Sequence, residues 1–221
     1  PVAIAQVDTP GNAQAVACSG TRIAVADGAS GLAIVDITDP PAAFVAHQLS
    51  QIGNVIAVDA SGPLAFVGGA SKVSIVDLAT GTILFPESPI DTTEAVHDLR
   101  VLGETLFVLT SARLRTFDLG GLSGEPLGSV AVPGSAATAR RRLSVGDDVA
   151  YVVSQQGLTT IDVFDPAAPA IISGPDFAPG VTNPMLAIAA NGSGLALVCG
   201  RPGFGAADPQ VQLFDVRDPQ N

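Results

Sequence analysis

Five aspartates recur along the sequence at nearly regular intervals, which makes them the first candidates for shared chemistry. They are separated by 41, 41, 44 and 53 residues and are Asp36, Asp77, Asp118, Asp162 and Asp215. A ring of carboxylates would bind cations. Alternatively, an Asp at a strand end accepts hydrogen bonds from the backbone N–H groups of the following turn. The choice between the two depends on where the fold places these residues.

A basic cluster is the second candidate, because three of only ten basic residues are adjacent in an acidic chain. These are Arg140, Arg141 and Arg142. A guanidinium near a histidine, here His97, would hold a carboxylate or phosphate ligand. The alternative leaves the arginines facing water and paired with acidic side chains, namely Asp98, Asp147 or Asp148.

The two histidines give little support for catalysis. His97 precedes Asp98, but adjacent residues of a strand point to opposite faces and do not readily form a base and its orienting carboxylate. His47 falls in a different segment, and neither histidine has a cysteine or carboxylate at a spacing typical of zinc ligands. We therefore expect no catalytic residue, no metal and no cofactor.

The elements that carry these residues repeat. One short apolar strand that ends in Asp occurs five times, as Leu32–Asp36, Val73–Asp77, Leu114–Asp118, Leu158–Asp162 and Val211–Asp215. A period in the low forties is what four short strands and their turns require, the unit of a propeller blade.

Each copy is preceded by another strand-like run of small and large apolar residues. These runs are Ile23–Ala26, Leu64–Val67, Leu106–Leu109, Ala150–Val153 and Leu195–Val198. A third strand, ending in a polar turn that contains glycine, is expected before each run. No helical periodicity is evident, so the sequence predicts an all-β fold.

The repeated strand resembles the LVIVD repeat, in which a Leu-Val-Ile-Val-Asp strand is followed by two variable residues and Asp-Pro. The copies that begin at Leu32, Val73 and Leu158 are the most similar, and the copy at Leu114 departs most. The resemblance implies a β-propeller and an extracytoplasmic bacterial protein, either periplasmic, secreted or on the cell surface. Its motif carries no catalytic residues.

We therefore predict a single five-bladed propeller with four-stranded antiparallel blades. The expected blades are residues 12–53, 54–94, 95–139, 140–184, and 185–221 together with 1–11. Residues 2–8 are expected to pair with the strand at 211–216 and close the ring, which would remove both exposed edges. The alternative is a piece of a longer propeller cut in the same phase.

This architecture bears on the candidate sites. The five aspartates would lie on the third strand of each blade, away from the axis, so they could not converge on one ion and the structural role is favoured. The arginines and His97 would lie near the mouth of the central channel. A long insertion at 201–209 would place Phe204 as an exposed contact on the same face, or would pack on its own blade.

Composition narrows the partners. The formal net charge is −11, which repels nucleic acid and anionic lipid. No apolar run approaches the length of a membrane span. We expect a non-catalytic binding or scaffolding module that presents loops to a protein partner. The alternative is a small-molecule or metal-dependent enzyme that uses the region around His97 and Arg141.

The two cysteines, Cys18 and Cys199, are expected to be unpaired. They would lie at turns on opposite faces of neighbouring blades, separated by about one strand length of roughly 17 Å. A disulfide needs Cα atoms within about 7 Å.

Overall fold

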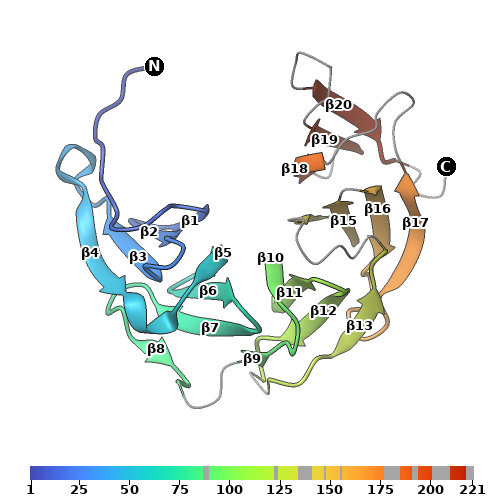
Figure 1. Cartoon of the computed structure of the whole chain (residues 1–221), viewed down its shortest axis with the longest axis horizontal. Coiled ribbons are helices and arrows are strands. Elements are labelled where there is room, and N and C mark those ends of the chain that lie inside the picture. Colours follow the sequence, from blue (N-terminus) through green and yellow to red (C-terminus); the bar gives the residue numbers. More distant parts are fainter. Residues whose placement is uncertain are drawn as a thin grey trace. The chain divides into compact units, whose positions relative to one another are not determined.

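The structure is a computed structural model of all 221 residues. It describes residues 1–86, 90–121, 124–133, 141–146, 148–154, 156–176, 185–190, 194–200 and 210–217. These residues form five antiparallel sheets, shown in Figure 1, and two short 3-10 turns, Pro40–Ala42 and Ser50–Ile52. The predicted all-β class and the five blades are confirmed.

The first two sheets have the expected order of strands. Blade one contains β1 (Ala15–Ser19), β2 (Arg22–Ala26), β3 (Leu32–Asp36) and β4 (Phe44–Leu49). Blade two contains β5 (Val55–Ser61), β6 (Leu64–Gly69), β7 (Lys72–Asp77) and β8 (Ile83–Leu84), and β9 (Ile90–Asp91) also pairs with β7.

The third and fourth sheets are four-stranded as well. Blade three contains β10 (Val96–Leu102), β11 (Thr105–Thr110), β12 (Arg113–Asp118) and β13 (Gly128–Ala131). Blade four contains β14 (Arg142–Gly146), β15 (Val149–Ser154), β16 (Gly157–Asp162) and β17 (Ala170–Asp176).

The fifth sheet has three strands among the described residues. They are β18 (Met185–Ala190), β19 (Leu195–Gly200) and β20 (Gln210–Asp215). In every blade the repeated strand predicted from the sequence is the third one, and its Asp is the last residue of β3, β7, β12, β16 or β20.

The N-terminal segment differs from the expectation. Residues 1–14 form no strand, and the expected pairing of residues 2–8 with residues 211–216 stays a prediction. The segment is held on blade one. The buried carboxylate of Asp27 accepts hydrogen bonds from Thr9 Oγ1 at 2.7 Å and Gly11 N at 2.8 Å, and Val7 packs against the apolar side of the sheet.

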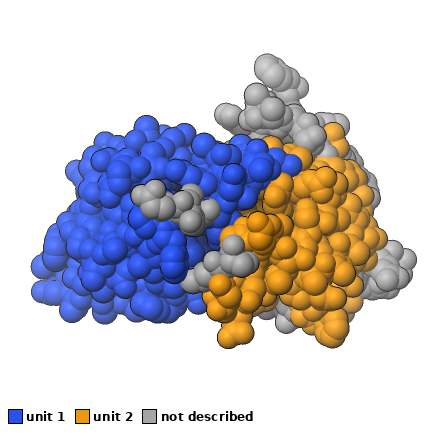
Figure 2. Space-filling model, turned by 90° about the horizontal axis from the view of Figure 1, so that it is seen from below, with its two compact units in different colours: residues 1–101 blue, residues 102–221 orange. Residues whose placement is uncertain are grey.

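The chain divides into two compact units, residues 1–101 and 102–221, which Figure 2 colours separately. In the first unit, one apolar cluster joins blades one and two and includes Leu32, Ile34 and Val67. In the second unit, one cluster joins blades three and four and another joins blades four and five. Packing of sheet on sheet therefore supplies the core. That the chain is a single domain stays a prediction.

Two further expectations can be compared with the structure. Both cysteines are free, as predicted; Cys18 is exposed and Cys199 is partly exposed. Among the described residues, no helix has the length and apolar character of a membrane span.

Candidate functional site

The strand-end aspartates have the structural role that was favoured. Each carboxylate accepts a hydrogen bond from the backbone N–H of a residue two or three positions later in the chain, at distances of 2.8 to 3.1 Å. Asp77 is the fullest example, because its Oδ1 accepts the N–H groups of Ala79 and Thr80 and the hydroxyl of Thr80. These carboxylates are thus engaged in hydrogen bonds with the turns that follow them.

The hydrogen bonds also change the acidity of three of these groups. The Arg217 side chain, its backbone N–H and its positive charge lower the pKa of Asp215 to about 2. Thr38, by its side chain and then its backbone, lowers the pKa of Asp36, and Arg22 adds to the effect. The backbone and side chain of Thr80 lower the pKa of Asp77.

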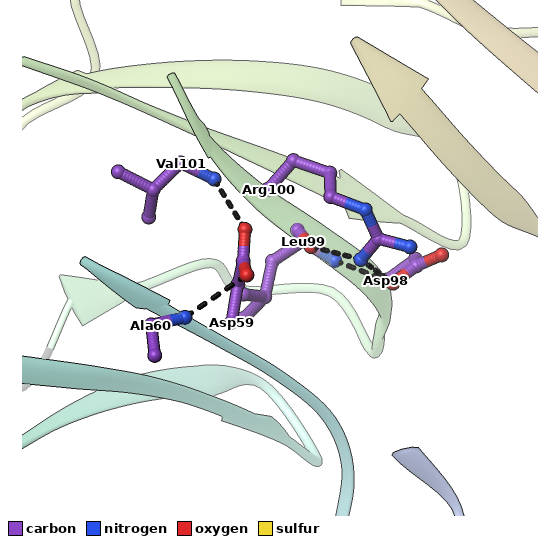
Figure 3. Close-up of polar contacts among 6 residues, drawn as sticks. All are labelled: Asp59, Ala60, Asp98, Leu99, Arg100 and Val101. Carbon is purple, nitrogen blue, oxygen red and sulfur yellow. Dashed lines mark hydrogen bonds and ion pairs between the residues drawn. The ribbon is translucent and has the colours of Figure 1, made fainter. Parts of the chain in front are cut away.

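His97 lies on β10 and is buried, with 7% of its surface exposed. Its neighbour Asp98 is 3% exposed and accepts hydrogen bonds from Leu99 N at 3.0 Å and Arg100 Nη1 at 2.9 Å, as drawn in Figure 3. Arg100 Nη1 also donates to the Leu99 carbonyl at 2.6 Å. This part of β10 is therefore a compact polar cluster in which the charges of Asp98 and Arg100 offset each other.

A second carboxylate in Figure 3 links two blades. Asp59 on β5 accepts Ala60 N at 2.9 Å through Oδ1 and Val101 N at 2.8 Å through Oδ2. Ser144 on β14 accepts Ala190 N at 3.1 Å in the same way. By strand register, Asp59 and Ser144 occupy equivalent positions on the first strand of their blades. In blades two and four, a side-chain oxygen at this position therefore links the blade to the next one.

The arginine cluster is only partly described. Arg141 is buried, with 1% exposed, and its Nη1 donates to the Val132 carbonyl at 3.3 Å. Arg142 begins β14 and is half-buried. Arg140 and Phe204 lie outside the described residues. Ligand binding by His97 and the arginines stays a prediction.

One feature was missed by the sequence analysis. A pocket of about 170 Å³ lies at the outer strand of blade two, lined by Gln51, Ile52, Lys72, Ser74, Ile83, Leu84, Phe85 and Pro86. Phe85 is 53% exposed and has a φ of 52°. An exposed aromatic at the edge of a hollow lined by both apolar and polar side chains is suited to holding a side chain of another molecule. Alignment of the five sequence repeats predicts the order of the strands but not which side chains are exposed. No signal in the sequence therefore distinguished Phe85.

Two other phenylalanines are exposed among the residues that the structure describes. Phe44, at the start of β4, is 54% exposed, and Phe164, in the turn after β16, is 77% exposed. Groups of three or more His, Cys, Asp or Glu side chains suited to a metal are absent from the part of the chain that the structure describes.

Comparison with known proteins identifies the repeat and the fold. The LVIVD repeat model matches residues 10–46 and 138–174, so the chain carries this repeat in its first and fourth blades. No curated protein matches.

Solved structures similar to this chain are β-propellers. The WD40 β-propeller domain of Doa1 has 12% identity and a TM-score of 0.68, covering 95% of this chain and 66% of its own. The Cps50 (Swd1) β-propeller domain of Myceliophteria thermophila has 16% identity and a TM-score of 0.63, with 93% and 72% covered. The designed protein Ika8 has 13% identity and a TM-score of 0.69, with 95% and 61% covered. The chain thus spans about two thirds or less of the solved chains of the Doa1 domain and of Ika8, and the likeness concerns the fold alone.

Proposed function

We propose that this chain, a β-propeller that carries LVIVD repeats, is a non-catalytic binding module that holds a protein partner at the rim of its blades. The observation that carries the proposal is the pocket of blade two with Phe85 at its edge. Aromatic anchors next to a pocket are typical of the residues that dominate binding between proteins.

The chemistry of the remaining groups supports binding more than catalysis. The strand-end carboxylates are engaged by their own turns, and Asp59 and Asp98 are bonded to backbone N–H groups. His97 and Arg141 are buried, whereas Phe85 is exposed. No observation favours the enzyme alternative over the binding module.

The resemblance of the repeat leads us to propose, in addition, an extracytoplasmic location. Fractionation of the source cells with an antibody against the chain tests this point. Recovery with periplasmic, secreted or surface proteins supports the location, and recovery with cytoplasmic markers contradicts it.

Site-specific photo-crosslinking in the source cells tests the binding site. Phe85 is replaced by p-benzoylphenylalanine, and Ser129, an exposed polar residue of β13, is replaced in the same way as a control. We expect a discrete adduct with another protein from position 85 and none from position 129. Equal adducts from both positions, or none from position 85, would contradict the proposed site.

A further inference from the structure

The pocket beside Phe85, which we call the blade-two pocket, lies in the seam between blades one and two. Gln51 and Ile52 come from the 3-10 turn after β4, and the other lining residues belong to β7, to β8 and to the two residues after β8. Ile52 and Ile83 also pack against the buried apolar cluster that joins the two blades. All of the described lining residues lie within residues 1–101, a single compact unit.

A buried hydroxyl group lies in this pocket without a protein partner. On its outer side, β7 pairs with β8 through Ile75 and Val76. It pairs with β9 through Lys72 and Val73. Ser74 lies between these two stretches, is only 7% exposed and lines the pocket. Among the described residues, its Oγ forms no hydrogen bond. A ligand that displaces water from the pocket must therefore supply a hydrogen-bonding group for this hydroxyl.

The pocket also carries a positive charge. Lys72, the only lysine of the sequence, is exposed and lines the pocket. Asp91 stands opposite Lys72 in the pairing of β7 with β9, but its carboxylate accepts the backbone N–H of Thr93 at 2.7 Å. In the part of the chain that the structure describes, Lys72 forms no ion pair. The ammonium group is thus a local attraction for an anion in a chain with a net charge of −11.

The size of the pocket limits what can enter it. Its volume of about 170 Å³ is close to that of a protein cavity of about 150 Å³ that holds one benzene molecule. It therefore has room for one side chain. Apolar walls from Ile52, Ile83 and Phe85 suit the methylene groups of that side chain. Ser74 and Lys72 suit a negatively charged end.

We propose that the blade-two pocket recognises an acidic side chain, glutamate best of all, in an exposed segment of the protein partner. The methylene groups of the glutamate contact the apolar walls, and its carboxylate pairs with Lys72 and accepts the hydroxyl of Ser74. An apolar anchor would leave the Ser74 hydroxyl without a partner, and a basic anchor would be repelled by Lys72. This inference rests on the proposed function, because it names the chemistry of the partner held beside Phe85.

Selection from a phage-displayed library of random seven-residue peptides on the purified full chain tests the inference. Only peptides that bind the wild type and fail to bind Phe85→Ser are kept, with the folding of each variant verified by thermal melting. We expect an acidic residue, most often glutamate, to be enriched at one position of these peptides. A selected peptide is then synthesised with both ends blocked, together with its glutamine counterpart, and calorimetry gives the dissociation constants.

A double-mutant cycle between the chain and the peptide gives the sharpest result. On the wild type, glutamine in place of glutamate should weaken binding about tenfold, because the ion pair with Lys72 is lost. Lys72→Gln should weaken the glutamate peptide to a similar extent and leave the glutamine peptide almost unaffected, whereas Lys72→Arg should retain most of the affinity. Ser74→Ala should also weaken the glutamate peptide. Arg113→Gln, an equal change of charge at an exposed residue of β12, is the matched control and should bind like the wild type.

The failure of this inference can be distinguished from the failure of the proposed function. Peptides that depend on Phe85 but show no enrichment of acidic residues overturn the inference and leave the binding module intact. The same holds if glutamine weakens binding equally on the wild type and on Lys72→Gln. If no selected peptide depends on Phe85, the inference is overturned together with the proposed binding site.

Discussion

At the scale of single residues, the carboxylate of Asp59 joins two blades by a hydrogen bond that its position in the sequence does not predict. It accepts the N–H of Val101, 42 positions further along the chain and on the next blade. Structural roles for the strand-end aspartates followed from the sequence, because Asp before a turn has a known local hydrogen-bonding pattern. Asp59 has no such pattern, since its partner is brought close only by the packing of blades.

Replacing Asp59 by Ala should lower the free energy of unfolding by about 1.5 to 3 kcal/mol, the range for hydrogen bonds to charged groups. The loss leaves the Val101 N–H without its acceptor. Chemical denaturation measures the change. Asp59→Asn is the control, because it keeps one acceptor oxygen and should retain part of the stability. Equal loss in the two variants would show that charge, and not the hydrogen bond to Val101, matters.

The strand-end aspartates predict how stability depends on pH. The folded pKa of Asp77 lies below the ordinary value of 3.8, and that of Asp215 is about 2. A carboxyl group with a lowered folded pKa stabilises the fold fully above its unfolded pKa, and this contribution is lost as the pH falls through the folded value. Stability should thus decrease between about pH 4 and about pH 2.

Denaturation of the wild type and of the Asp77→Asn variant across this pH range checks whether Asp77 loses its stabilising effect as the pH falls. The wild type should be the more stable of the two above pH 4, and the difference should shrink as the pH falls, because protonated Asp77 no longer accepts the Thr80 hydrogen bonds as an anion. A difference that grows toward low pH would contradict the assignment.

At the scale of elements, strand order followed from the sequence because the period and the terminal Asp recur in every blade. The exact ends of the strands and the conformation of the N-terminal segment could not be predicted from the sequence. The N-terminal segment has strand-like residues, but the hydrogen bonds of Thr9 and Gly11 to the buried Asp27 hold it on blade one. Such a contact depends on a buried acceptor that no periodicity marks.

Glycine positions between elements give a sharp prediction. Gly31, before β3, has a φ of 86°, and a Cβ there would lie 2.1 Å from the Leu49 carbonyl oxygen. Gly103, in the hairpin after β10, has a φ of 60° but no atom within 4 Å of the same point. Gly31→Ala should therefore cost about 3 kcal/mol or more through strain and steric overlap, and Gly103→Ala only about 1 to 2 kcal/mol through strain.

Denaturation midpoints of the two glycine variants, measured side by side, distinguish these effects. Similar losses at both positions would mean that the turn between blade-one strands at Gly31 relaxes to admit a methyl group.

At the scale of the whole molecule, composition and exposure determine what the surface can bind. A net charge of −11 predicts no measurable affinity for duplex DNA at physiological salt, because phosphate contacts dominate such binding. Fluorescence anisotropy with a labelled duplex provides the measurement. Salt-dependent binding in the micromolar range or tighter would be incompatible with this expectation.

The candidate site was the part least accessible to sequence. The repeat pattern placed His97 and Arg141 near the mouth of the central channel, but it could not show that both side chains are buried. Exposure is a property of the packed sheets. For the same reason the pocket beside Phe85 became evident only when the outer strand of blade two was seen next to Gln51 and Ile52.

The most direct test of the binding-module account is the yield of the crosslinked adduct at position 85 in two further backgrounds. Ile52→Ser alters the lining of the blade-two pocket beside Phe85. His97→Gln alters the polar cluster of β10 and leaves that pocket intact. With folding verified by thermal melting, the account predicts that Ile52→Ser reduces the adduct about tenfold, equivalent to about 1.4 kcal/mol of binding, and that His97→Gln leaves it unchanged. An adduct that survives Ile52→Ser but disappears with His97→Gln would contradict the account and place the functional site on β10.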